Sequence, residues 1–175
     1  LEQYWKLDSE KKTLTGQTKE DPKFNTFFCS QQEYGDFELS FKVKLTKGIG
    51  NSGVQIRSAL VDEKKFVVAG PQCDMGQQYW GSLYGEKVGG MMQASKADVV
   101  KSKVKADDWN DYSIVAKGDH VTIKVNGETM VDQDFKMLPD KKKESPMAKK
   151  GIIAWQLHAG PPMTVEFTEI AFKKN

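Results

Sequence analysis

A strict two-residue alternation of apolar and polar side chains constrains this chain more than any other feature. In residues 36–45, written DFELSFKVKL, the residues Phe37, Leu39, Phe41, Val43 and Leu45 fall on one face. Charged or polar residues occupy every position between them. This period is that of a β-strand with one buried face, and it is incompatible with a helix of 3.6 residues per turn. The sequence therefore predicts a half-buried strand here.

Further strand-like runs follow, and helix signals are thin. Residues 112–116 and 120–125 are rich in β-formers and are separated by a short turn, and Asn126-Gly127 leads directly into residues 128–131. An Asn-Gly pair between two such runs is a strong hairpin signal. Residues 151–158 and 164–172 read as another strand pair, interrupted by a Gly-Pro-Pro sequence. Many short strands with regular turns predict an all-β fold, a two-sheet antiparallel sandwich or a barrel.

Length and composition fit one soluble domain, which we expect to span residues 1–175. The 26 basic and 24 acidic residues leave a net charge of +2, and Arg57 is the sole arginine. Such a chain has neither the positive electrostatic potential nor the several arginines that are typical of a nucleic-acid-binding protein. No apolar run is long enough to cross a bilayer. Cys29 and Cys73 fit no metal pattern, and free thiols are favoured over a disulfide between them.

Polar side chains gather on one face of three predicted strands. Val54 and Ile56 alternate with Gln55 and Arg57, and Cys73 separates Gln72 from Asp74. In residues 153–158, the apolar positions alternate with Gln156 and His158 in the same way. This face carries amides, a guanidinium, a carboxylate and an imidazole in place of the usual lysines and glutamates. Such groups suit a ligand with hydroxyl and carbonyl oxygens.

Each of these residues also has a purely structural interpretation. Arg57 and Asp74 would form an ion pair inside the fold, and His158 alone would be a buried, hydrogen-bonded histidine. The aromatics of the glycine-rich loop 75–90, Tyr79, Trp80 and Tyr84, either stack on a sugar ring or cap the end of the sandwich. Glu86 would form an exposed salt bridge, and residues 136–150, with two prolines and six lysines, read as a solvated loop.

A set of motifs in a fixed order resembles the 3-keto-disaccharide hydrolase family, from about Trp5 to the C-terminus. The segments are YGDFEL (34–39), GNSGVQIR (50–57), QCDMG (72–76), YWGSLYGE (79–86), WNDY (109–112), VNG (125–127) and QLHAGPPM (156–163). The resemblance implies a concanavalin A-like jelly roll that binds carbohydrate on its concave sheet. It also implies a secreted or periplasmic protein. Because the chain begins abruptly at Leu1, we expect that a leader or an upstream segment has been removed.

The resemblance further implies chemistry on glycosides whose ring carries a ketone at position 3. A ketone acidifies the hydrogen on the adjacent carbon, so a base can start an elimination that expels the glycosidic oxygen. This route needs a base and a group that holds the enolate oxygen, and it does not need the paired carboxylates of ordinary glycosidases.

Roles follow for the residues of the polar face. His158 or Asp74 is the expected base, Arg57 with Gln72 would hold the enolate, and Glu86 or Tyr84 would protonate the leaving oxygen. Hydroxyl groups would be bound by Asn51, Gln55 and Gln156, with Trp80 as a further substrate contact. A divalent cation on Asp74 and His158 is an alternative electrophile to Arg57.

Two other functions compete with catalysis. Relatives with the WGSLY loop often carry an arginine shortly after the glutamate, whereas KVGG follows Glu86 here. That departure favours a non-catalytic glycan-binding module on the same fold, since the fold does not determine the function. A structural interaction domain is the third candidate. Convergence of Arg57, Asp74 and His158 in one pocket would favour an enzyme over both.

Overall fold

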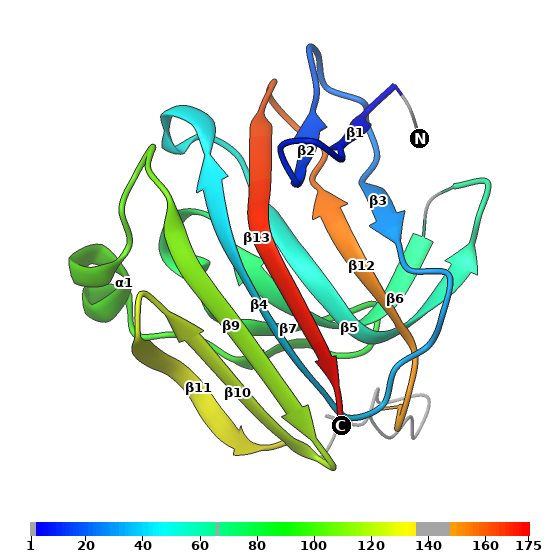
Figure 1. The fold of residues 1–175 in the computed structure, drawn as a ribbon, viewed down its shortest axis with the longest axis vertical. Coiled ribbons are helices and arrows are strands. Elements are labelled where there is room, and N and C mark those ends of the chain that lie inside the picture. The colour runs from blue at the N-terminus through cyan, green and yellow to red at the C-terminus, as the bar shows by residue number, and fades with distance from the viewer. Residues whose placement is uncertain (1–2, 66, 136–147) are drawn as a thin grey trace.

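The computed structural model describes residues 3–65, 67–135 and 148–175, and it is a sandwich of two antiparallel sheets (Figure 1). This confirms the predicted all-β fold. The proposed loop at 136–150 lies largely outside the described residues. No helix in the described part of the chain has the length and apolar character needed to cross a membrane.

Sheet A has seven strands in the order β1-β2-β13-β4-β9-β10-β11. Their bounds are β1 Trp5–Asp8, β2 Thr13–Gln17, β13 Thr164–Lys174, β4 Phe37–Leu45, β9 Asn110–Lys117, β10 His120–Val125 and β11 Glu128–Asp134. Sheet B has six strands in the order β3-β12-β5-β6-β7-β8. Their bounds are β3 Thr26–Cys29, β12 Ile152–Leu157, β5 Ser52–Asp62, β6 Val67–Met75, β7 Leu83–Glu86 and β8 Gly90–Gln93. One short α-helix, α1 (Ala97–Lys103), lies beyond the edge of the strands in the described part of the chain, and Thr46–Gly48 and Gln77–Tyr79 form single 3-10 turns.

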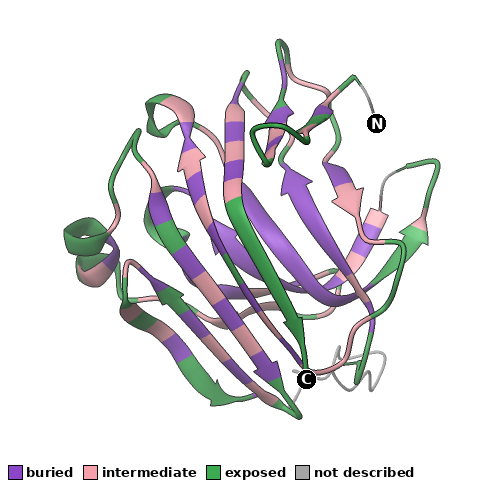
Figure 2. Ribbon diagram, viewed as in Figure 1, coloured by how far each residue is buried: buried purple, intermediate pink, exposed green. Residues whose placement is uncertain are grey.

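The core fills the space between the sheets with the alternating apolar residues that the sequence marks. The five predicted inward residues of β4 are all buried, and the residues between them are not. Phe41 stacks on Tyr112 at 5.2 Å and meets Trp155 of the opposite sheet edge-on at 4.9 Å. Figure 2 shows β5 and β12 buried along most of their length, whereas the second half of β13 is exposed. Sheet B therefore forms the less exposed layer of the sandwich.

The expected hairpin at Asn126-Gly127 is confirmed, because both residues adopt positive φ and join β10 to β11. The expected pairing of residues 151–158 with 164–172 is wrong. β12 pairs with β3 and β5 in sheet B, whereas β13 pairs with β2 and β4 in sheet A. The Gly-Pro-Pro segment is thus a crossing between sheets. Cys29 and Cys73 are both free thiols.

Candidate functional site

A cavity of about 260 Å³ opens on the face of sheet B that is turned away from the core. It is lined by residues of β6, β7, β8 and β12 and of the adjoining loops: Asn51, Gln72, Asp74, Tyr79, Tyr84, Glu86, Met91, Gln156 and His158. Seven of these nine residues were predicted from strand alternation or from the family resemblance, with Tyr79 noted only as an alternative. Nothing in the sequence pattern singles out Met91. The structure therefore brings most of the predicted polar face together.

A ladder of buried amides forms the floor of this cavity. Ser58 lies within 2.9 Å of Gln55 Oε1, and Gln55 Nε2 donates to Gln72 Oε1 at 3.1 Å. Gln72 Nε2 in turn donates to Asp74 Oδ1 at 2.8 Å and to Gln156 Oε1 at 3.2 Å. An amide nitrogen has two hydrogens, so Gln72 uses both. The ladder therefore fixes the orientation of every amide in it. Gln55 is fully buried beneath the cavity and supports Gln72, so it does not line the cavity itself.

A glycine makes this ladder sterically feasible. Gly53 pairs with both Asp74 and Gln156 in the sheet, and it lies between them. The side chain of Gln72 crosses directly over Gly53, because a Cβ at that position would lie only 2.7 Å from Gln72 Cγ and 2.9 Å from Gln72 Nε2. Real Cβ atoms do not approach other heavy atoms so closely. Because Gly53 of β5 has no side chain, the Gln72 side chain of β6 can cross β5 and reach Gln156 of β12.

Gly53→Ala is expected to displace the Gln72 amide and break its hydrogen bond to Asp74. Because that bond lowers the pKa of Asp74, its loss raises this pKa further. The overpacked site should also lose about 1–3 kcal/mol of stability. The measurement is a carboxyl-carbon NMR titration of Asp74 in both proteins. Gly127→Ala is the control, because its Cβ meets open space but its φ of 80° is strained, so it should cost stability without changing the titration of Asp74. An unchanged titration in Gly53→Ala would show that Gln72 does not depend on the gap.

Asp74 has the most perturbed carboxyl group of the cavity. Its side chain is only 7% exposed, and burial raises its pKa from 3.8 to about 7. The Gln72 hydrogen bond opposes this shift, and the nearby charge of Glu86 adds to it. A carboxyl group with a pKa near neutrality can both accept and return a proton at physiological pH. The environment of Asp74 is therefore suited to general base catalysis.

Two buried polar atoms at the cavity have no hydrogen-bond partner among the described residues. They are Asn51 Oδ1 and Gln156 Nε2, an acceptor and a donor. Buried polar atoms are almost always paired in folded proteins, so such atoms in a binding cavity await a partner from a ligand or solvent. The pair would suit a ligand that presents both an oxygen acceptor and a hydroxyl hydrogen.

His158, Glu86 and Tyr84 surround the opening. Nδ1 of His158 bonds to the carbonyl oxygen of Ala159, and because a carbonyl only accepts, that nitrogen carries the hydrogen. Nε2 of the neutral ring is then left free to accept a proton. Glu86 lies 3.8 Å from Lys87, which agrees in part with the structural interpretation of an ion pair, but it also lines the cavity.

The predicted placement of Arg57 on this face is wrong. Its guanidinium donates to the carbonyl oxygens of Gly35 and Gly118 and forms a 2.9 Å ion pair with Asp36. The side chain is 2% exposed and points toward sheet A, and it is not paired with Asp74. The alternative of an ion pair between Arg57 and Asp74 is therefore also wrong, because the partner of Arg57 is Asp36, and Asp74 and His158 line the cavity without Arg57.

A β-bulge at this point explains the change of face. β5 has one more residue than either neighbour between Gln55 and the next paired position, and Arg57 adopts a φ of 46°. An extra residue with positive φ reverses the alternation of the strand. Gly151 and Gly70 flank the bulge, and a Cβ on either would collide with Arg57 or Ser58. The bulge in β5 therefore depends on glycines on both sides of it, Gly70 in β6 and Gly151 just before β12.

Trp80 is also misplaced as a substrate contact. It is 5% exposed and belongs to the hydrophobic core, where it lines a separate cavity with Leu45 and Val100. The alternative interpretation, an aromatic cap on the sandwich, applies to Trp80. Its neighbour Tyr79 faces the cavity instead and is exposed.

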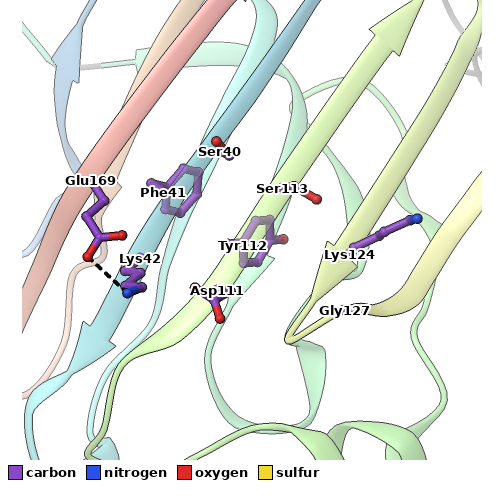
Figure 3. A pocket seen from close by; sticks show the side chains of 9 residues that line it. All are labelled: Ser40, Phe41, Lys42, Asp111, Tyr112, Ser113, Lys124, Gly127 and Glu169. Atoms are coloured by element: carbon purple, nitrogen blue, oxygen red, sulfur yellow. Dashed lines mark hydrogen bonds and ion pairs between the residues drawn. The ribbon is translucent and has the colours of Figure 1, made fainter.

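A second hollow lies on the outer face of sheet A, and the exposed Lys42–Glu169 ion pair at 2.9 Å lines one side of it (Figure 3). Within the described ranges, no three His, Cys, Asp or Glu residues are grouped so as to hold a metal ion.

Comparison with known families agrees with these observations. A model of the family described as the 3-keto-alpha-glucoside-1,2-lyase-like domain matches residues 2–173. The chain belongs to this family. The resemblance to 3-keto-disaccharide hydrolases inferred from the sequence is thereby confirmed. A search of curated proteins gave no match.

Solved structures similar to this member of the lyase-like family share its fold. A candidate glycosyl hydrolase from Parabacteroides distasonis is 19% identical, with a TM-score of 0.69 over 100% of this chain and 92% of that one. A galectin-like Bacillus subtilis protein of unknown function is 12% identical, with a TM-score of 0.65 over 98% and 86%. The carbohydrate-binding module CBM66 from Bacillus subtilis is 12% identical, with a TM-score of 0.62 over 97% and 91%. At these identities the likeness concerns the fold alone.

Proposed function

We propose that this protein cleaves glycosides that carry a ketone at ring position 3, by elimination across carbons 1 and 2. One observation carries the proposal: a buried carboxyl group with a pKa of about 7, that of Asp74, lies in a cavity lined by unpaired amide atoms. Membership of a family described as lyase-like supports the same chemistry.

Asp74 acts as the base in this proposal. Its carboxylate takes the hydrogen from carbon 2, and the electron pair of that bond moves to form an enolate with the ketone. The enolate then reforms the ketone and expels the glycosidic oxygen from carbon 1. The products are an unsaturated keto sugar and, once protonated, the free alcohol. Addition of water across the new double bond gives the overall hydrolysis.

The leaving oxygen needs a proton, and three groups near the opening are candidates for donating it. They are Glu86, Tyr84 and a protonated His158, all of which line the cavity with Asp74. The charge of Glu86 raises the pKa of Asp74, so the two carboxyl groups lie close enough to interact.

A glycan-binding module without catalysis is the second candidate function. The exposed side chains of Tyr79 and His158 at the opening, together with the fold shared with a carbohydrate-binding module, favour it. Binding alone, however, gives no reason for a carboxyl group with a raised pKa at the floor, since burying it costs stability.

The test is release of alcohol from a 3-keto-glucoside by the wild type, Asp74→Asn and His158→Ala. Loss of the base is expected to reduce kcat by about 10²–10⁴ in Asp74→Asn. His158→Ala should reduce kcat less, because Asp74 remains. Turnover that is undiminished in both variants would refute the assignment. Binding of the keto sugar by a wild type without turnover would favour the binding module.

A further inference from the structure

Gln156 stands out among the cavity residues because its amide is fixed at one end and free at the other. Its side chain is 1% exposed, and Oε1 accepts a hydrogen bond from Gln72. That bond settles which end of the amide is oxygen, so Nε2 is the end without a partner. A buried donor with two unused hydrogens is costly unless the ligand supplies an acceptor.

The backbone of Gln156 is also fixed. Ser52 Oγ donates to its carbonyl oxygen at 2.6 Å, and the pairing with Gly53 holds the strand in register. The Gln72 amide contacts both Asp74 and Gln156, so Gln156 lies one side chain away from the proposed base. A donor and a base held so close together can act on adjacent atoms of one sugar ring.

The proposed elimination requires such a donor. Negative charge develops on the ketone oxygen as carbon 2 loses its hydrogen, and a prealigned N–H stabilises that charge. Arg57 was the sequence-based candidate, but its guanidinium is bound to Gly35, Asp36 and Gly118 elsewhere. Gln72 has no hydrogen left to donate. Among the amides at the floor, Gln156 keeps its donors free.

We infer that Gln156 Nε2 is the donor that binds the ketone oxygen of the substrate and holds it as the enolate forms. This inference rests on the proposed function. A ketone oxygen only accepts hydrogen bonds, so it matches Gln156 Nε2, which can only donate. The hydroxyl of an unoxidised sugar brings a hydrogen that needs an acceptor of its own. Gln156 thus selects the oxidised sugar and also assists the reaction.

Two substitutions separate the role of Gln156 Nε2 as a hydrogen-bond donor from the other roles of Gln156. Gln156→Glu keeps the size of the side chain and an acceptor for Gln72 but removes the donor. Gln156→Met removes the donor without adding charge. Because removal of one oxyanion donor typically costs 10²–10³ in kcat, both variants are expected to lose about that much with a KM changed less than tenfold. Both are also expected to lose the preference for the keto sugar over its parent glucoside in calorimetric binding.

Gln93→Glu is the matched control. It makes the same chemical change on β8 of the same sheet, outside the cavity, and should leave kcat and binding unchanged. Thermal unfolding of all variants checks that they are folded. The inference is overturned if both Gln156 variants keep kcat within about threefold and also keep the preference for the keto sugar.

The two proposals fail in different ways. If the wild type shows no turnover but its preference for the keto sugar disappears in both Gln156 variants, the elimination is refuted and the ketone-binding role of Gln156 stands. If the wild type turns over and both variants do so equally well and keep the preference for the keto sugar, the elimination stands and the role of Gln156 is refuted.

Discussion

Asp74→Asn should make the protein more stable at pH 8 while removing its activity. Burial raises the pKa of Asp74 to about 7 in the folded protein, against 3.8 for the free side chain. The folded state therefore holds this proton more tightly than the unfolded state, and the free energy of unfolding falls as the pH rises from about 4 to about 7. An asparagine of the same shape carries no charge, so it avoids this loss.

The expected gain is roughly 2–4 kcal/mol at pH 8, since three pKa units correspond to about 4 kcal/mol at most. Urea unfolding at pH 8 and at about pH 4 measures it, and the two proteins should differ little at the lower pH, where Asp74 is protonated. A stability difference that is the same at both pH values would show that Asp74 has an ordinary pKa. A gain in stability with a loss of turnover is typical of a functional residue held in an unfavourable environment.

Arg57→Met should destabilise the fold by about 3 kcal/mol, because it leaves two backbone carbonyls and the carboxylate of Asp36 without their buried partner. Because methionine keeps much of the buried aliphatic part of the side chain, the loss in the free energy of unfolding measures the contribution of the guanidinium group. Since Arg57 lies outside the cavity, the affinity for the keto sugar should not change. Urea unfolding and calorimetric titration give the two quantities.

Lys42→Met is the control for Arg57→Met. It also removes one cation from an ion pair, but the Lys42–Glu169 pair is exposed and should contribute less than about 1 kcal/mol. An Arg57→Met protein as stable as the wild type but unable to turn over substrate would contradict the structural role and restore the catalytic one.

The features of the fold that depend on a local sequence pattern were predicted correctly. The alternation in β4 gave both the strand and its buried face, and Asn126-Gly127 gave the hairpin, because each signal is contained within a few adjacent residues. The polar face was also predictable where strands are regular, as in Gln72 with Asp74 and Gln156 with His158.

Arg57, Trp80 and the pairing of β12 and β13 depend on residues that are distant in the chain. The bulge at Arg57 exists because Gly70 in β6 and Gly151, just before β12, leave room for it, and no local pattern marks it. A Gly-Pro-Pro segment looks the same in a hairpin as in a crossing between sheets. The role of Gly53 follows only from the side chain that passes over it.

The most direct test of the account is the pH dependence of kcat/KM for release of alcohol from a 3-keto-glucoside. If Asp74 is the base, kcat/KM should rise with pH through an inflection near 7, the pKa of its carboxyl group in the free protein. The inflection should vanish with the activity in Asp74→Asn. A wild-type protein that binds the keto sugar but releases no alcohol at any pH from about 5 to 9 would contradict the account.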